Sequence, residues 1–192
     1  TNNTGLDGTA ISGACATAAE GTGATCSWNT TGVTPGSYYV YGITNDGVNP
    51  QVSAYSSGQI TINARPTISV SQPDGVSDTV NQGDSYNITY SLSDSDDVST
   101  AAFYFDTNNS GLDGNAISGA CATAAEGSNV TCSWNTAGVA TGSYYVYGIT
   151  NDGTNPQVSE YSSGQITINP IPVLTVSTTG TQTSSMTVPS TD

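Results

Sequence analysis

Apolar side chains alternate with polar ones along several short stretches of this chain. Tyr86, Ile88, Tyr90 and Leu92 are separated by single polar residues, and the stretch 130–134 alternates in the same way. A period of two places the apolar side chains on one face of a β-strand. No stretch carries the 3.6-residue apolar period of an amphipathic helix, so the pattern predicts an all-β chain.

Between residues 64 and 169 the pattern predicts about seven short antiparallel strands, separated by Asp-, Asn- and Gly-rich turns. The expected strands are 66–71, 86–92, 100–106, 115–119, 130–134 and 143–150, followed by a last strand over 157–161 and 165–168 that breaks at Ser163 and Gly164. Seven short strands in a segment of this length are typical of an immunoglobulin-like β-sandwich.

The chain also repeats itself with a period of 106 residues. Residues 1–63 align without a gap on 107–169, with 53 of 63 positions identical, and 170–177 is a looser copy of 64–71. Such a period predicts a tandem array of similar modules. We therefore expect 1–63 to be the C-terminal part of one module, 64–169 to be a complete module, and 170–192 to be the first strand or strands of the next.

The segment 1–63 lacks counterparts of the strands in 66–106. Its apolar face, which includes Val40, Ile43 and Ile60, is therefore expected to be open unless other strands cover it. These strands would come from sequence upstream or from another chain, as in donor-strand assembly, and both alternatives stay open. The expected partners are thus neighbouring modules of the same chain or other copies of the chain.

Two longer strings in the chain resemble a known family. The stretch SWNTAGVATGSYYVYGITNDGTNPQVSEYSSGQITI (133–168) and the preceding SLSDSDDVSTAAFYFDTNNSGLDG (91–114) are similar to bacterial immunoglobulin-like or fibronectin type III-like repeats of large secreted surface proteins. The resemblance implies a β-sandwich repeat, and it implies that Tyr144 or Tyr145 forms a tyrosine corner. It departs from antibody domains in its cysteines, which lie close together before the Tyr-rich strand.

Charge restricts the partners. The chain has fifteen acidic residues and one basic residue, Arg65, for a net charge of −14. Nucleic acids and anionic membranes are excluded as partners, since both require basic patches, whereas cations are favoured. No apolar stretch approaches the roughly 20 residues of a membrane-spanning helix, so membrane insertion is not expected.

The four cysteines form two pairs at identical spacing, Cys15/Cys26 and Cys121/Cys132. With no histidine, a zinc site would need all four thiolates, which lie a full module apart. Two local disulfides are therefore predicted, each worth on the order of 3 kcal/mol in the loop-entropy model, with pairs of buried thiols as the alternative. Disulfides indicate an oxidising compartment, so we expect an extracellular or cell-surface protein.

The first candidate calcium site is the loop 106–114. Side-chain oxygens stand at positions 1, 3 and 5 of a calcium-loop pattern, with a glycine at position 6 and a carbonyl at position 7. A further carboxylate follows, but position 12 is Ile117 instead of the bidentate Glu, so the match is partial and a simple polar turn is the alternative. The residues concerned are Asp106, Asn108, Ser110, Leu112 and Asp113.

The second candidate site is the cluster Asp94, Asp96 and Asp97. In an immunoglobulin-like sandwich this turn shares an end with the turn that holds Asp152, and that end faces the preceding module. Carboxylates crowded there repel one another unless they are solvated or bridged by a cation. A calcium ion at this junction would stiffen the array; a solvated acidic loop beside Arg65 is the alternative.

Catalysis is not expected, because the chain has no His, no Lys and no free thiol if both disulfides form. The tyrosines are assigned mainly to core packing, with sugar stacking as the alternative. Glycans remain a further possibility, since Asn-x-Ser/Thr triplets begin at Asn2, Asn29, Asn87, Asn108 and Asn129.

The sequence thus predicts a structural segment of a long extracellular repeat protein, such as a filament, stalk or adhesin. Its role would be to provide length and stiffness, with calcium as a tentative stiffening ion. The alternative is an accessory module that binds carbohydrate or another ligand in a secreted adhesive or glycan-active protein.

Overall fold

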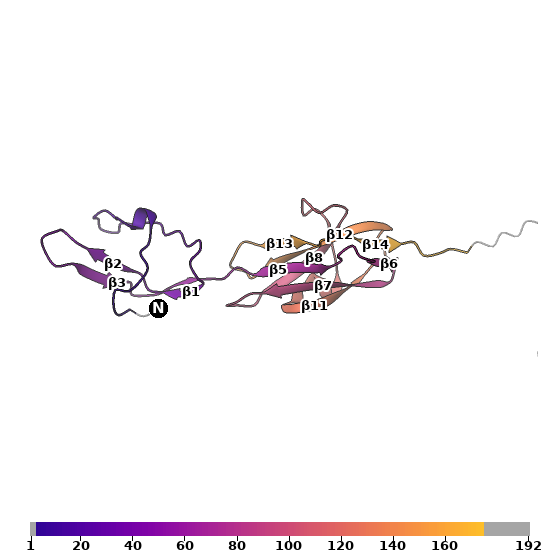
Figure 1. Cartoon of the computed structure of the whole chain (residues 1–192), viewed down its shortest axis with the longest axis horizontal. Coiled ribbons are helices and arrows are strands. Elements are labelled where there is room, and N and C mark those ends of the chain that lie inside the picture. The colour runs from indigo at the N-terminus through magenta and orange to yellow at the C-terminus, as the bar shows by residue number, and fades with distance from the viewer. Residues whose placement is uncertain (1–2, 175–192) are drawn as a thin grey trace, which may run out of the picture.

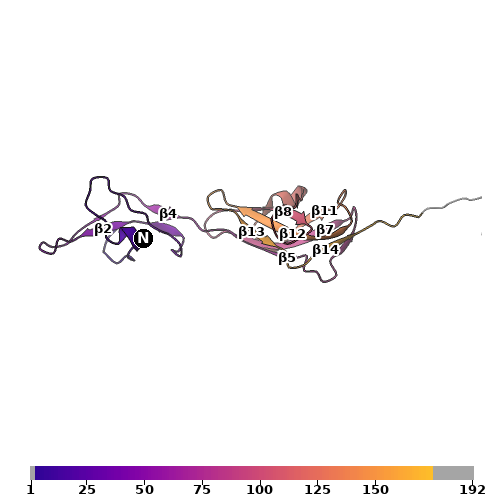
Figure 2. The same cartoon turned by 90° about the horizontal axis from the view of Figure 1, so that it is seen from above.

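A computed structural model describes residues 3–174, which form two bodies in line (Figures 1 and 2). We call residues 1–63 the N-terminal segment and residues 64–169 the central module. A short linker, 63–66, joins them, and residues 170–174 leave the central module at its opposite end (Figure 1). No α-helix is found among the described residues; the helical turns are of the 3₁₀ type.

The smaller sheet of the central module has three antiparallel strands in the order β11–β7–β5. They are β5 (Thr67–Gln72), β7 (Ser85–Ser93) and β11 (Gly127–Asn135). The alternation that predicted β7 is confirmed, because Ile88, Tyr90 and Leu92 point into the core while the residues between them face outward.

The larger sheet has seven strands, with β12 (Gly142–Asn151) at its centre. Its other strands are β6 (Thr79–Asn81), β8 (Thr100–Asp106), β9 (Asn115–Ala116), β10 (Ala124–Ala125), β13 (Val158–Tyr161) and β14 (Ile166–Asn169). β12 pairs with β8 along one edge. Along its other edge it pairs with β14 through residues 142–144 and with β13 through residues 147–150, and a loop separates β13 from β14.

Three details of the strand prediction are wrong. The central module has ten strands instead of seven, because β6 and β10 were missed and the expected last strand is two strands, β13 and β14. β6 pairs with β14 in parallel, so the module is not purely antiparallel. The strand expected over 115–119 ends at Ala116, since Ile117 turns into the core and Gly119 adopts a φ of 75°, which starts a 3₁₀ turn.

The core lies between the two sheets. Its fully buried side chains come from both of them, with Ile88 and Leu92 on one side and Phe103, Val146 and Ile166 on the other. Gly148 lies at the closest approach of the sheets: a Cβ atom there would lie 2.5 Å from Ile68 Cδ1 and 2.9 Å from Phe103 Cε1. The glycine thus lets β5 pack directly over β12.

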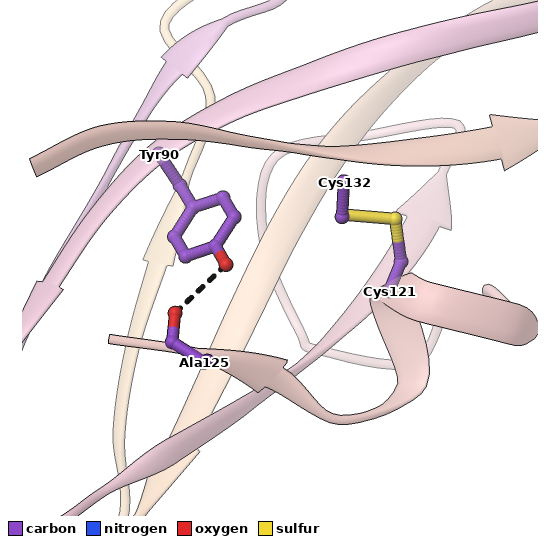
Figure 3. Close-up of a disulfide and its surroundings, with 4 residues drawn as sticks. All are labelled: Tyr90, Cys121, Ala125 and Cys132. Atoms are coloured by element: carbon purple, nitrogen blue, oxygen red, sulfur yellow. Dashed lines mark hydrogen bonds between the residues drawn. A yellow bond between two sulfur atoms is a disulfide. The ribbon is translucent and has the colours of Figure 1, made fainter. Parts of the chain in front are cut away.

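Both predicted disulfides are present, Cys15–Cys26 and Cys121–Cys132. Cys121 lies in the 3₁₀ turn η2 (Gly119–Ala122) and Cys132 on β11, so the bond fastens the crossover between β9 and β10 to the smaller sheet (Figure 3). A second tie runs beside it, since the Tyr90 hydroxyl donates to the carbonyl of Ala125 at 2.8 Å (Figure 3).

The N-terminal segment pairs its strands as the central module does. It contains η1 (Gly13–Cys15), β1 (Gly36–Tyr38), β2 (Tyr41–Thr44), β3 (Val52–Tyr55) and β4 (Ile60–Ile62). β1 pairs with β4 and β2 with β3 in the registers that β12 makes with β14 and β13. None of its residues from 3 to 63 is buried.

Residues 170–174 form no strand and are exposed. The expected pairing of 170–177 as a first strand falls partly on 175–177, which lie outside the described residues.

Candidate cation site at the module junction

The linker is hydrogen-bonded to the acidic turn that follows β7. The Ala64 N–H donates to both carboxylate oxygens of Asp96, at 3.1 and 3.0 Å, and the Asn63 side-chain amide donates to Asp97 Oδ2 at 2.8 Å. Ala64 is only 6% exposed. The linker is therefore hydrogen-bonded to the module that follows it.

The turn between β12 and β13 holds the linker from the other side. The Asn155 side-chain amide donates to the Asn63 side-chain oxygen and to the Ala64 carbonyl. The Arg65 guanidinium reaches the Pro156 carbonyl at 3.4 Å. These two residues of the turn thus act as a clamp on the linker.

Asp152 keeps the clamp in shape. Its Oδ1 accepts the N–H groups of Thr154 and Asn155, at 2.9 and 2.8 Å, and its Oδ2 accepts the Asn155 side-chain amide at 2.7 Å. Desolvation opposes ionisation, but these hydrogen bonds from Asn155 and Thr154 outweigh it and lower the pKa of Asp152. Asp152 is therefore a carboxylate whose oxygens are engaged within the turn.

Asp94, Asp96 and Asp97 bring three carboxylates together at this junction. One oxygen of each lies within 4.8 Å of the others, and this is the one such acidic or cysteine group among residues 3–174. Both oxygens of Asp94 are buried and lack a hydrogen bond of good geometry among the described residues, although the backbones of Ser95 and Asp96 lie close enough to interact with them. Desolvation raises the pKa of Asp94 despite the opposing Asp96 and Ser95 backbone N–H groups, and the Asp96 side chain and the charge of Asp97 add to the rise. Hard oxygens in this arrangement suit Ca²⁺.

Glu126 borders the cluster and was missed by the sequence analysis. Its Oε1 accepts the N–H and the hydroxyl of Ser99, at 3.0 and 2.8 Å, and these bonds, aided by the backbone of Asp94, lower its pKa. Its identity with the aligned Glu20 was no specific signal, because 53 of the 63 aligned positions are identical. It braces the turn that carries the three aspartates.

The other candidate, the loop 106–114, lies at the far end of β8. Since a strand rises about 3.3 Å per residue, roughly 20 Å separates it from the junction. Asp106 accepts the Asn108 N–H at 3.2 Å and the Tyr161 hydroxyl at 3.0 Å, while Asn108 Oδ1 accepts the N–H and hydroxyl of Ser110 at 2.8 Å.

The backbone of this loop is also fixed by tyrosines. The Leu112 N–H donates to the Tyr161 hydroxyl at 3.1 Å, and the Gly114 N–H donates to the Tyr147 hydroxyl at 3.2 Å. A small hollow of about 170 Å³ is lined by Asp106, Asn108 and Asp113. The loop therefore has a folded shape of its own, in which the side-chain oxygens of Asp106, Asn108 and Ser110 are already hydrogen-bonded.

The comparisons with known proteins concern the central module. Residues 66–147 match a family model described as a bacterial Ig domain. The central module therefore has an immunoglobulin-like β-sandwich fold and is similar to bacterial Ig domains over residues 66–147. A search of curated proteins gave no match.

Among solved structures, the chain is similar to fibronectin(III)-like modules of CbhA from Clostridium thermocellum, with 16% sequence identity and a TM-score of 0.39. The match covers 72% of this chain and 65% of that one, which is less than two thirds of its length.

The immunoglobulin-like domain contains the expected tyrosine corner. The residue is Tyr144, whose hydroxyl donates to the Ala140 carbonyl at 3.0 Å, and Tyr38 makes the same bond to Thr34 at 2.6 Å. Other tyrosines serve packing: Tyr147 is 1% exposed and lies between Tyr104 and Tyr161, at centroid distances of 4.9 and 4.7 Å. No helix in the described part of the chain is long and apolar enough to cross a membrane.

Proposed function

We propose that this chain is a structural segment of an extracellular repeat protein, a filament, stalk or adhesin, in which linked immunoglobulin-like modules give length and stiffness. The organisation into a partial module, a central module and the start of a third is part of this proposal. Two disulfides support an oxidising compartment, and the role is non-catalytic.

The observation that carries the proposal is the linker at 63–66. A spacer is stiff only if each linker is fixed to the module that follows it, because a flexible linker lets modules reorient freely. Here the linker donates to Asp96 and Asp97 on one side and is held by Asn155 on the other. These contacts fix the direction in which the chain enters the sandwich.

Calcium would strengthen this junction. Three carboxylates in contact repel one another, and a bound Ca²⁺ offsets that repulsion. A Ca²⁺ ion bound by these three aspartates would hold their turn in one conformation, and this turn contacts Asn63 and Ala64. We therefore assign the calcium role to Asp94, Asp96 and Asp97 before the loop 106–114, because three carboxylates meet within 4.8 Å there.

The ligand-binding alternative has less support. It would be favoured by a row of exposed aromatic rings on one sheet, but Tyr144 and Tyr147 are buried. Tyr161 is half-buried and its hydroxyl holds the loop 106–114. The tyrosines thus serve the fold.

Order in the linker tests the spacer function. Nitrogen-15 relaxation on the 1–192 chain is expected to give order parameters near 0.85 for the Ala64 and Arg65 amides, as for rigid strands. Asn155→Ala removes the clamp and should lower them towards 0.6, the range of flexible backbone. Asn49→Ala, at the aligned position of the N-terminal segment, should leave them unchanged. Loop-like order at Ala64 in the unsubstituted chain would contradict the proposal.

A further inference from the structure

We infer that the N-terminal segment carries a preformed docking surface for a polypeptide stretch of the 64–106 type. This stretch would have the strand pattern of β5 to β8, with an isoleucine at the position of Ile68 and an Asp-Gly pair at the positions of 74 and 75. The inference rests on the array organisation proposed above and identifies the partner that this surface fits.

The first observation is exposure at identical positions. Ile60 is 43% exposed, whereas the aligned Ile166 is fully buried. Trp28, Tyr38 and Val40 are only half-buried, although their counterparts form part of the core. The counterparts in the central module are Trp134, Tyr144 and Val146, which pack under the strands of 64–106. The N-terminal segment therefore exposes an apolar surface. The corresponding surface in the central module is covered by residues 64–106.

The second observation concerns two glycines. In the central module Gly148 and Gly164 lack room for a side chain because 64–106 approaches them: a Cβ on Gly148 would lie 2.5 Å from Ile68 Cδ1, and one on Gly164 would lie 2.2 Å from the Asp74 carbonyl carbon. The aligned residues are Gly42 and Gly58, and nothing lies within 4 Å of a Cβ at either position. Gly42 and Gly58 therefore leave room for a polypeptide stretch like 64–106, and no such stretch lies against them.

The third observation is a copy of the linker clamp. Asp46 accepts the N–H groups of Val48 and Asn49 at 3.0 and 2.8 Å and the Asn49 side-chain amide at 2.7 Å. Asp152 makes the same three bonds within its turn. The Asn49 amide is thus oriented like that of Asn155, which holds the linker. The surface fits an incoming linker as well as the strands that follow it.

Residues 64–106 of the same chain cannot cover this surface. The linker enters the central module at the end opposite to the one where residues 170–174 leave it (Figure 1). β4 corresponds to β14, and the chain passes from Asn63 directly to Ala64, with no residues to cross the length of a module. Exchange of residues 64–106 between copies of the 1–192 chain cannot cover every such surface. Each copy supplies one such stretch but has two surfaces that accept it, one on the N-terminal segment and one on the central module.

The test is an extended chain in which a second copy of residues 63–106 precedes Thr1. Residue 106 normally precedes residue 107, the counterpart of Thr1, so this fusion restores the natural register. Amide exchange is expected to show protection of 36–44 and 60–62 equal to that of 142–151, on the order of 100-fold above the 1–192 chain. The original 1–192 chain should exchange rapidly at 36–44.

Gly42→Val and Gly58→Val provide the matched variants. In the extended chain each should abolish the new protection, and in the 1–192 chain each should leave the unfolding of the central module unchanged. Gly148→Val and Gly164→Val should destabilise the central module.

Two results would overturn the inference. One is an extended chain in which 36–44 still exchanges rapidly while 142–151 stays protected. The other is a 1–192 chain already protected at 36–44, either as a monomer or as a dimer that supplies the cover itself. The linker order described above is measured on the original chain, so failure of this inference and failure of the spacer function are distinguishable.

Discussion

Among single residues, Asp94 has surroundings that disfavour its negative charge. Its two carboxylate oxygens are buried and lack a hydrogen bond of good geometry among the described residues, and Asp96 and Asp97 add negative charge within 4.8 Å. Two like charges 4 Å apart repel by about 1 kcal/mol even in bulk water. The cost is present in the metal-free protein and is removed if a cation binds, so substitution of Asp94 should have opposite effects in the two conditions.

We therefore expect Asp94→Asn to raise the melting temperature in chelator and to lower it, relative to the unsubstituted chain, in calcium. A gain of about 1 kcal/mol corresponds to roughly 4–8 °C for a domain of this size. Calcium at 100 times its Kd should stabilise the unsubstituted chain by about 2.7 kcal/mol, and the variant should lose most of that gain. Scanning calorimetry of the 1–192 chain in both conditions measures the crossover.

Asp113→Asn separates the two candidate sites. If this variant, rather than Asp94→Asn, loses the calcium response, the ion binds in the loop 106–114. Identical melting in chelator and in calcium for the unsubstituted chain would eliminate calcium from the proposal.

The acidic cluster could be predicted because three aspartates fall within four residues directly after a strong strand. Glu126 could not be selected on those grounds. Its role depends on the crossover bringing it beside Ser99, which is 27 residues away in the sequence. A contact of that separation is set by the packing of the two sheets and leaves no local pattern.

Among the elements, the crossover 115–126 and its counterpart in the N-terminal segment show how burial differs between two similar sequences. The central module and the N-terminal segment have the same cysteine spacing, but Cys121 and Cys132 are 0% and 4% exposed, whereas Cys26 is exposed and Cys15 half-buried. Thiol–disulfide exchange requires direct attack of a thiolate on a sulfur, so access controls its rate. The two disulfides should therefore differ in reactivity despite identical neighbours in the sequence.

Mild reductant should open Cys15–Cys26 first. With limiting dithiothreitol and rapid alkylation, mass spectrometry should find label at Cys15 and Cys26 while Cys121 and Cys132 stay bonded. Denaturant removes the difference in burial and serves as the control, in which both bonds should open at similar rates. Equal opening without denaturant, or earlier opening of Cys121–Cys132, would contradict the burial argument.

The predictability of the strands follows from their length. β5, β7, β8, β11 and β12 were predicted because each shows alternation or a run of aromatic and β-branched residues over five positions or more. β6 has three residues and β10 has two, too few for a period of two to be visible. Both exist because a partner far along the chain, β14 or β8, offers a free edge. Such pairing is a property of the assembled sandwich.

For the whole molecule, the linker before the central module can be compared with the aligned residues that follow it. Residues 63–66 read Asn-Ala-Arg-Pro, and the aligned residues 169–172 read Asn-Pro-Ile-Pro. Ala64 uses its N–H to bond Asp96, and Arg65 reaches the Pro156 carbonyl. Pro170 has no N–H and Ile171 has no charge, so the second linker cannot make either contact. We therefore expect the junction at 63–66 to be stiffer than one with the sequence of residues 169–172.

Replacing the first linker by the second tests this directly. The double variant Ala64→Pro/Arg65→Ile should lower the relaxation order parameter of Asn63 and broaden the distribution of lengths in small-angle X-ray scattering. The central module should keep its melting temperature to within a few degrees, because a loss of about 0.5 kcal/mol shifts it by only 2–4 °C. Arg65→Ile alone should have the smaller effect, since it leaves the Ala64 N–H bonded to Asp96. If the double variant keeps the order and scattering of the original chain, the linker bonds do not set the stiffness, and packing around Ala64 and Pro66 must do so instead.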